Sequence, residues 1–481
     1  MTPPFALPCP QPAPRRLPWL ALLGCALAGM AGAEAPAAGH GPASVLAPAQ
    51  APQYRADYWA ARLPDADTAY LSPAQVTAQN ARMVALDPYI EDLSRLPATL
   101  PGAEVGASIG KASPRPARTL YDQDGKALGA ATLEALQAAL ALDALTASVT
   151  PRFGLVVARA DLRTFPTTQR VFSTPGDLDI DRFQESALFP GDPVAVLHES
   201  RDGRWWFVAS QRYRAWVEAR HVALGSRAQV LGYAQRAPAR VVTGAIAHTV
   251  YTPELPALSA LQLDMGVRLP LRTGGPADAP VNGQHPHASW VLDLPLRRDD
   301  GSLAFAPALL PPTADTAADY LPATPRNLLE QAFKFLGERY GWGHAYATRD
   351  CSGFVSEVYR SVGLLLPRNT GAQATSPALA QVALPPPGER AARRALLQTL
   401  EVGDLVYIPG HVMMVIGHDQ GMTWVIHDTA GASWAGADGQ LVRARLNGVA
   451  VTPLEPLRTD ADTLYLDRIT HIRRLRPHTA Q

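Results

Sequence analysis

The sequence is short of cysteine, of net charge and of long apolar runs, and each shortage excludes a class of protein. Its 481 residues include only three cysteines, which excludes a fold held together by several disulfides. Lysine plus arginine and aspartate plus glutamate number 43 each, so the charge gives no indication of a nucleic-acid partner. Beyond the N-terminal region no stretch is long and apolar enough to span a bilayer. What remains is a multidomain globular protein.

Residues 1–33 have the pattern of an export signal. Arg15 and Arg16 precede an apolar stretch, and the small-residue motif AGA ends at residue 33. The motif LLGC, ending at Cys25, also resembles a bacterial lipobox, so lipidation is an alternative to cleavage. We expect an exported protein that is periplasmic, an outer-membrane lipoprotein of a Gram-negative bacterium, or secreted. It would meet a membrane only through such an N-terminal lipid anchor.

Either form of processing leaves one cysteine to be explained. Both remove Cys9, and Cys25 is either removed or lipidated, so Cys351 would be the only free thiol of the mature chain. Proteins exported to an oxidising compartment usually carry paired cysteines or none. A buried, inert thiol is the simplest interpretation of a lone cysteine, and a catalytic thiol is the alternative.

The pattern of apolar residues along the chain predicts four segments after the signal peptide. Apolar residues at helical spacing follow Ser72 and Pro73, and a second helical pattern lies near residues 130–145. Further on, short apolar runs are separated by glycine, aspartate and proline, which is typical of small all-β barrels. The predicted segments are a flexible leader and helical N-terminal domain (34–148), a first barrel (149–225), a second barrel (226–323) and a C-terminal domain (324–476).

The C-terminal domain is predicted to be α+β, because two helical patterns precede several strands. The first helix should begin at Thr324-Pro325 and the second should run from Cys351 to Val362. Asp350 is a good N-cap and places Cys351 in the first turn of its helix. Helix N–H groups and the helix dipole favour a thiolate there, which is typical of a nucleophile.

Two histidines on predicted strands could complete a catalytic group. His411 begins the run HVMMVIGH, and His427 ends the run TWVIHD. A hairpin loop of three residues, 419–421, would place His427 opposite Met413 and on the face of His411. A two-residue loop would place the histidines on opposite faces. Zinc binding by Cys351 and the two histidines is the alternative, although the chain has no CxxC or HExxH spacing.

These residues resemble a known family. The segments DCSGFVSEVYRSVGLLLPRNTGAQ, GDLVYIPGHVMMVIG and VIHD are similar to the NlpC/p60 cysteine peptidases, papain-like hydrolases of bacterial cell-wall peptides. The resemblance implies a papain-like α+β fold for the whole C-terminal domain. It also implies that Cys351 is the nucleophile, that His411 is the general base and then the acid, and that His427 orients His411. It implies no cofactor and no metal.

The upstream segments are similar to one subgroup of this family. A helical segment and two bacterial SH3-like barrels occur in enzymes that cleave the γ-D-glutamyl to diamino-acid bond of peptides with a free N-terminal L-alanine. In that subgroup the first barrel narrows the cleft. The substrate-binding candidates implied here are Glu185 and Tyr213 at the amino end, Asp350 on the ammonium, Tyr340 near the oxyanion, Ser352 beside the nucleophile, and Arg368 and Thr370 in the cleft wall.

Three positions depart from the family pattern. His344 stands where a second glycine often follows, Thr370 where serine is usual and Ala215 where glycine is usual. The expected partners are peptidoglycan-derived peptides. Two alternatives stay open: a peptidase or amidase acting on intact, crosslinked peptidoglycan, and a non-catalytic wall-binding scaffold whose thiol is incidental.

Overall fold

The computed structural model describes residues 49–274 and 279–475. The predicted signal peptide, Cys9 and Cys25 lie outside this range, and so does the last residue of the predicted C-terminal domain. Within the described residues no helix has the length and apolar character that a membrane span requires.

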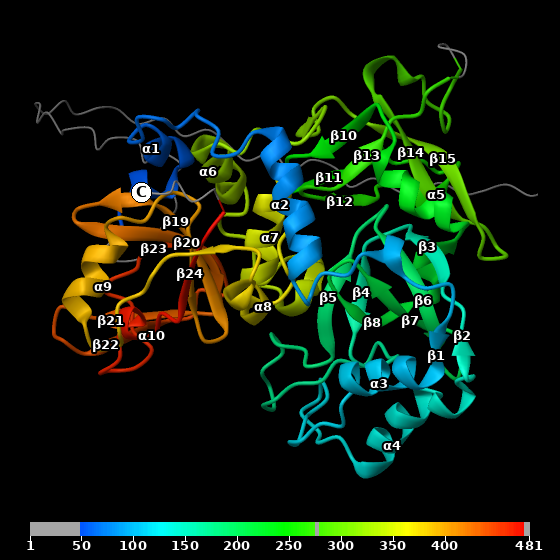
Figure 1. The fold of residues 1–481 in the computed structure, drawn as a ribbon, viewed down its shortest axis with the longest axis horizontal. Coiled ribbons are helices and arrows are strands. Elements are labelled where there is room, and N and C mark those ends of the chain that lie inside the picture. The colour runs from blue at the N-terminus through cyan, green and yellow to red at the C-terminus, as the bar shows by residue number, and fades with distance from the viewer. Residues whose placement is uncertain (1–48, 275–278, 476–481) are drawn as a thin grey trace, which may run out of the picture. The chain divides into compact units, whose positions relative to one another are not determined.

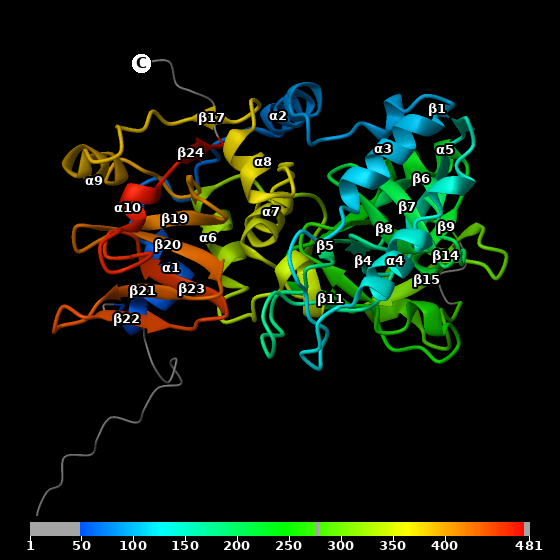
Figure 2. The same ribbon diagram turned by 90° about the horizontal axis from the view of Figure 1, so that it is seen from below.

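The predicted N-terminal helical segment joins two different cores. Its first part contains α1 (Ala56–Ala60) and α2 (Pro73–Leu86), and Ser72 caps α2 by accepting a hydrogen bond from the Gln75 N–H. Apolar residues of this part pack in the core of the C-terminal domain. Helix α2 lies beside α7 and α8 (Figures 1 and 2), where the Asn80 amide donates to the carbonyl oxygen of Gly363 over 2.7 Å.

The second part of the segment belongs to the first barrel. It contains β1 (Leu100–Pro101), α3 (Gly102–Ala112), α4 (Ala130–Ala139) and β2 (Ser148–Val149). Val105 and Ile109 of α3 and Leu136 of α4 pack in one core with Phe153 and Trp216 of the barrel. The helical segment is therefore divided between the two domains that will form the cleft.

The first barrel is a seven-stranded sheet with the order β5-β4-β8-β7-β6-β3-β9. Every pairing in it is antiparallel, and β-bulges interrupt the register beside Arg163 and beside His198. Its strands are β3 (Arg152–Val156), β4 (Ala160–Arg163), β5 (Gln184–Leu188), β6 (Pro193–Glu199), β7 (Trp205–Ser210), β8 (Arg214–Glu218) and β9 (Val222–Leu224). This part of the predicted fold class is confirmed.

The second β unit has its own small core. After α5 (Arg227–Gly232), its strands form the sheets β13-β10-β16, β11-β12 and β14-β15. Leu263, Leu269 and Leu292 are fully buried in this core. The strands are β10 (Ala239–Val242), β11 (Ile246–His248), β12 (Gln262–Asp264), β13 (Arg268–Pro270), β14 (Trp290–Arg297), β15 (Leu303–Leu310) and β16 (Thr316–Ala317).

The C-terminal domain is built on a six-stranded antiparallel sheet with the order β17-β24-β18-β19-β20-β23. One face packs on α6 and α7, and the other packs near α9 and α10. The predicted α+β class is confirmed. The elements are α6 (Pro325–Phe333), α7 (Cys351–Ser361), α8 (Thr370–Thr375), β17 (Ala380–Gln381), α9 (Arg390–Leu397), β18 (Leu405–Ile408), β19 (His411–Asp419), β20 (Met422–Thr429), β21 (Ala432–Ala435), β22 (Leu441–Ala444), β23 (Gly448–Pro453), α10 (Tyr465–Arg468) and β24 (His471–Arg474).

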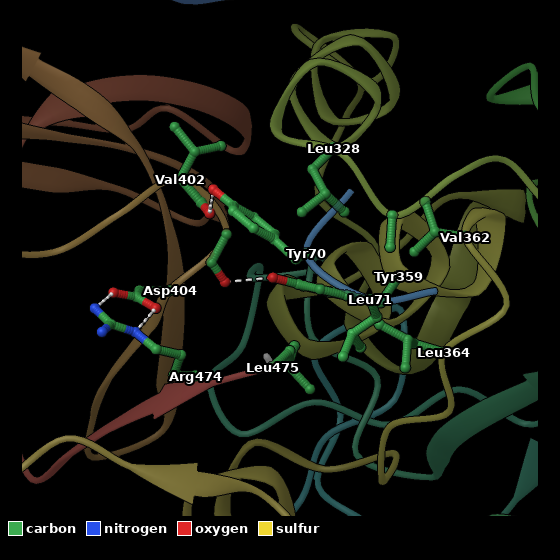
Figure 3. A pocket seen from close by; sticks show the side chains of 12 residues that line it. Tyr70, Leu71, Leu328, Tyr359, Val362, Leu364, Val402, Asp404, Arg474 and Leu475 are labelled. Carbon is green, nitrogen blue, oxygen red and sulfur yellow. Dashed lines mark hydrogen bonds and ion pairs between the residues drawn. The ribbon is translucent and has the colours of Figure 1, made fainter. Parts of the chain in front are cut away.

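A small cavity marks where the N-terminal segment closes over this domain (Figure 3). It has a volume of about 20 Å³ and lies between Tyr70, α6, α7 and the end of β24. The Tyr70 hydroxyl donates to the carbonyl oxygen of Val402 over 3.1 Å, and Arg474 pairs with Asp404. These contacts have a structural role, because the cavity is mostly apolar and too small for a substrate.

Candidate active site

Cys351 lies at the N-terminus of α7, as predicted. The Asp350 carboxylate accepts a hydrogen bond from the Gly353 N–H over 2.8 Å, which makes Asp350 the N-cap. The Asp350 carbonyl oxygen accepts from the Phe354 N–H. The first N–H groups of a helix have no partner within the helix, so those of Cys351 and Ser352 stay available to a ligand.

The carboxylate of Asp350 has other partners besides the Gly353 N–H that it caps. It accepts five hydrogen bonds, from the Gly353 and Gly343 N–H groups, the Ser352 hydroxyl and two nitrogens of Arg368. Burial opposes its ionisation, but Arg368 holds the pKa of Asp350 well below its usual range. Asp350 is therefore a buried anion already paired with a cation, which was not anticipated from the sequence.

The two histidines lie together. His411 Nε2 is 2.8 Å from His427 Nδ1, and His427 Nε2 is 3.0 Å from the Thr452 hydroxyl. If Thr452 accepts from His427 Nε2–H, then His427 Nδ1 accepts from His411 Nε2–H, and Nδ1 of His411 is left free as a base. Thr452 is on β23, the neighbour of β20, and was missed in the sequence because nothing in its own segment marks it.

The hairpin that joins the histidines has a different turn from the predicted one. Asp419 pairs with Met422, so the loop has two residues, Gln420 and Gly421, both with positive φ. The predicted three-residue loop is wrong. A β-bulge at Ile416 shifts the register back, and from there Met414 pairs with Ile426. The next pair in this register would be Met413 with His427, as predicted.

Gly417 makes the bulge possible. Its φ of +143° is a conformation that other residues rarely adopt. A Cβ atom at this position would also lie 2.9 Å from the Trp59 ring of the N-terminal segment. The register that brings His411 and His427 together thus depends on one glycine and on the segment that packs against it.

The reactive groups are neutral in the free protein. Cys351 is 5% exposed, and burial followed by the Asp350 charge raises the pKa of its thiol to about 12. Burial lowers the pKa of His411 to about 4 and that of His427 well below its usual value. The expected thiolate is therefore not the resting form, because burial and Asp350 outweigh the helix N-terminus. A neutral thiol and a neutral imidazole can react by general-base catalysis.

Two further predicted residues lie around the thiol. The Thr370 hydroxyl is 3.6 Å from Cys351 Sγ, and a backbone hydrogen bond from Val412, the residue after His411, also reaches the thiol. Tyr340 is buried, and after burial the nearby Cys351 and Asp350 raise its pKa further. Thr370, at the position of the expected serine, still supplies a hydroxyl group.

Glu185 and Tyr213 form a pair on the first barrel. The Tyr213 hydroxyl donates to one oxygen of the Glu185 carboxylate, and the Thr164 hydroxyl donates to the other over 2.7 Å. Both residues line a cleft of about 980 Å³ that also includes Arg368 and Asn369 of the C-terminal domain. The cleft therefore has one wall from the barrel and another from the segment that follows α7.

A buried ionic network behind the site was not predicted. Arg349 is fully buried and donates to Glu357 over 2.7 Å, to Glu338 over 2.8 Å and to Asp264 of the second β unit over 2.9 Å. Asp264 also pairs with Arg159 of the first barrel. Charged residues are seldom fully buried unless they are paired, so this network ties both β units to the segment that precedes Cys351.

His344 belongs to the same network. It is buried with a φ of +64°, and its ring contacts Glu357 over 3.0 Å and Arg368 over 2.9 Å. Arg368 also donates to the Ser186 hydroxyl of β5 over 2.8 Å. The histidine at the position of the expected glycine thus fixes Arg368, which holds both Asp350 and the first barrel.

No group of three or more histidine, cysteine, aspartate or glutamate side chains among residues 49–274 and 279–475 is arranged to hold an ion. Cys351 contacts Thr370 and Val412, while the two histidines contact each other and Thr452.

Comparisons with known proteins match two regions of the chain. Residues 170–218 match the SH3 domain (SH3b1 type), and residues 337–448 match the NlpC/P60 family. Two curated relatives, both named "Probable endopeptidase p60", come from Listeria welshimeri and Listeria seeligeri. They are 48% and 46% identical over 50 residues, and that match covers 10% of this chain and 10% of each relative.

A solved structure shares the fold over most of the chain. It is described as a novel NlpC/P60 endopeptidase from Photobacterium damselae subsp. piscicida, with a TM-score of 0.63 and 16% sequence identity. The match covers 81% of this chain and 88% of that one. At this identity the comparison establishes the arrangement of the domains and nothing about the substrate.

Proposed function

Because residues 337–448 form an NlpC/P60 domain behind an SH3b1-type domain, we propose that the protein is a cysteine endopeptidase of peptidoglycan stem peptides. The bond hydrolysed is the one between γ-D-glutamate and a diamino acid, in peptides with a free N-terminal L-alanine. The predicted signal peptide would deliver the enzyme to the compartment where such peptides occur.

Cys351 is the nucleophile and His411 the base. His411 Nδ1 takes the thiol proton as Sγ attacks the γ-carbonyl carbon of D-glutamate, and His427 accepts a hydrogen bond from His411 Nε2–H. The new imidazolium is stabilised by this hydrogen bond. The N–H groups of Cys351 and Ser352 and the hydroxyl of Tyr340 are the candidates for binding the oxyanion.

Three proton transfers complete the reaction. His411 gives its proton to the leaving amine as the C–N bond breaks, which leaves a thioester between Cys351 and the γ-carboxyl group. A water molecule then attacks the thioester carbon while His411 takes its proton. The C–S bond breaks, and His411 returns the proton to the Cys351 sulfur.

The observation that carries the bond specificity is the pair Glu185–Tyr213 in the cleft next to Arg368 and Asn369. Glu185 keeps lone pairs for a substrate ammonium, since each of its oxygens accepts one hydrogen bond from the protein. Asp350 is paired with Arg368, which lines this cleft, so much of its carboxylate is already occupied. A barrel wall at this point leaves room for a free amino end and would exclude a glycan chain.

Mass spectrometry of L-Ala-γ-D-Glu-meso-diaminopimelate incubated with the enzyme tests the proposal. We expect release of free diaminopimelate by the wild type and a loss of at least about 10³-fold in Cys351→Ala. Acetylation of the L-alanine nitrogen should reduce kcat/KM by about 100-fold, because it removes the ammonium that Glu185 binds. Glu185→Gln should lose most of this discrimination.

Other results would favour the alternatives. Equal cleavage of the acetylated peptide, or of intact crosslinked peptidoglycan, would keep the thiol chemistry and contradict the role of the barrel as a gate. Absence of cleavage from every substrate, with a folded protein, would favour a wall-binding scaffold.

A further inference from the structure

A second pocket includes Tyr340 in its lining and shares no lining residue with the Glu185 cleft. It has a volume of about 590 Å³, within the range of small-molecule sites. We call it the Tyr340 pocket; its lining is Pro175, Gly176, Asp177, Asp179, Ile180, Tyr340, Ala430, Gly431 and Arg445. Tyr340 lies between α6 and α7. The other residues come from the loop between β4 and β5, which reaches from the first barrel toward the C-terminal domain (Figure 1), and from the segments that follow β20 and β22.

The lining of this pocket includes residues that lie near the catalytic ones. Strand β20 carries His427 and leads directly to Ala430, three residues later. Tyr340, in the pocket wall, lies near Cys351, since the charge of Cys351 contributes to the raised pKa of Tyr340. The Glu185 cleft, by contrast, reaches the site through Arg368.

The pocket carries charges of both signs. Asp179 is held between Arg339, at 2.5 Å, and Arg445. The Arg445 side chain is 72% exposed, so most of its donors are free for a ligand. Asp177 has no ion pair among the described residues, and one of its oxygens accepts only the Asp179 N–H at 3.2 Å. An acid and a guanidinium group are thus both available at this rim.

We propose that the Tyr340 pocket binds the diamino acid that leaves, with Asp177 on its distal ammonium and Arg445 on its distal carboxylate. This inference rests on the proposed function. The amino end of the substrate occupies the Glu185 cleft and the scissile carbonyl lies at Cys351, so the leaving residue has to extend away from that cleft. The pocket beside Tyr340 and the end of β20 is the space that the structure offers.

The pair of charges predicts which diamino acid is preferred. Diaminopimelate ends in an ammonium and a carboxylate, whereas lysine ends in an ammonium alone. A guanidinium can bind a carboxylate with two hydrogen bonds, and nothing on lysine would use it. The enzyme should therefore favour diaminopimelate over lysine and lysine over a residue without distal charge.

Three peptides of the form L-Ala-γ-D-Glu-X test this inference, with X as meso-diaminopimelate, L-lysine or L-norleucine. We expect the wild-type kcat/KM to fall in that order, by about tenfold at each step. Arg445→Gln should lower cleavage of the diaminopimelate peptide to the level of the lysine peptide and leave the other two within about twofold. Asp177→Asn should lower the first two and spare the norleucine peptide.

Matched variants separate recognition from loss of charge or structure. Arg443→Gln removes an exposed arginine of β22, two residues before Arg445, and Asp299→Asn removes an exposed aspartate of the second β unit. Both should preserve the wild-type order. Asp179 keeps Arg339 as a partner in Arg445→Gln, so that variant does not leave a carboxylate unpaired.

The outcomes distinguish the two proposals. Equal wild-type rates on the three peptides, or a uniform loss in Arg445→Gln, would overturn the assignment of the Tyr340 pocket while the proposed reaction stands. Cleavage of none of the peptides would overturn the proposed reaction and this assignment with it.

Discussion

Two groups of buried side chains meet at Cys351, and they differ in charge. The neutral group consists of the Cys351 thiol and of His411, His427 and Thr452, which are linked in that order by single hydrogen bonds. The ionic group, formed by Asp350, Arg368, Arg349, Glu357 and Asp264, is joined by ion pairs that reach both β units. We infer that the neutral group carries the chemistry and that the ionic group holds the domains around it.

The difference has a physical reason. A proton can move between the thiol and the imidazole only if their neutral and charged forms are close in free energy, and rigid ion pairing would oppose this. Holding a loop between two domains has the opposite requirement. A guanidinium with several carboxylate partners fixes several backbone segments at once, and removing one partner is costly.

The largest loss of activity without loss of stability is expected from His411→Ala. Loss of the base should lower kcat/KM by at least about 10³-fold and leave the midpoint of unfolding nearly unchanged. Steady-state kinetics and thermal denaturation measure the two effects. His418→Ala, on the same strand, is the control and should retain activity within about threefold. A large loss of stability in His411→Ala would contradict the division into two groups.

For Arg349→Met, in the ionic group, we expect the main loss to be in stability. This variant leaves Glu357, Glu338 and Asp264 without their common partner. It should cost about 3–5 kcal/mol in the free energy of unfolding, measured with urea. Adding Glu357→Gln should restore part of the loss, because it removes one of the orphaned charges. An unchanged urea midpoint would mean that the network contributes nothing to the assembly of the domains.

Asp428 belongs to neither group, because it is a buried acid without a partner. It follows His427 and is fully buried, and neither carboxyl oxygen has a hydrogen-bond partner in the structure. Burial first, and then the charges of Asp350 and Glu338, raise its pKa well above the usual value. The folded protein therefore holds a proton at Asp428 that the unfolded chain releases.

This sets the sign of a pH effect on stability. The stability contributed by protonated Asp428 is complete below the unfolded pKa and is lost as pH rises toward the folded pKa. Asp428→Asn should match the wild type at acidic pH and become progressively more stable than it, by at most about 1.4 kcal/mol per pH unit. Thermal denaturation across pH 4 to 8 measures the difference. A difference in stability that does not change with pH would contradict the raised pKa of Asp428.

The smallest effect is expected from Thr452→Val. It removes the hydroxyl group that contacts His427 Nε2 and should cost about 1 kcal/mol, or about fivefold in kcat/KM. Thr452→Ser should keep the hydroxyl group and most of the activity. If valine and serine had equal effects, packing rather than the hydrogen bond would explain the role of Thr452.

The hairpin of β19 and β20 was predicted only in part from the local sequence pattern. The face shared by His411 and His427 was predicted correctly, but from a three-residue loop that does not exist. The structure reaches the same face with a two-residue loop and a bulge at Ile416. The bulge needs Gly417 at a φ of +143° and contacts Trp59, more than 350 positions away in sequence, so the strand sequence alone could not reveal it.

Elements whose cause is local can be read from the amino-acid sequence. Asp350 before an apolar helix fixes Cys351 in the first turn, and Ser72 and Thr324 cap their helices through hydrogen bonds three residues away. The short apolar runs of the barrels and the order of helices and strands also follow from local periodicity.

The environment of these residues depends on tertiary contacts. Burial of Cys351 beside Asp350 sets the resting thiol, and the partners of Arg349 come from three separate parts of the chain. Thr452 meets His427 because β23 pairs with β20. Desolvation and long-range pairing depend on which surfaces meet, and no short stretch of sequence specifies that.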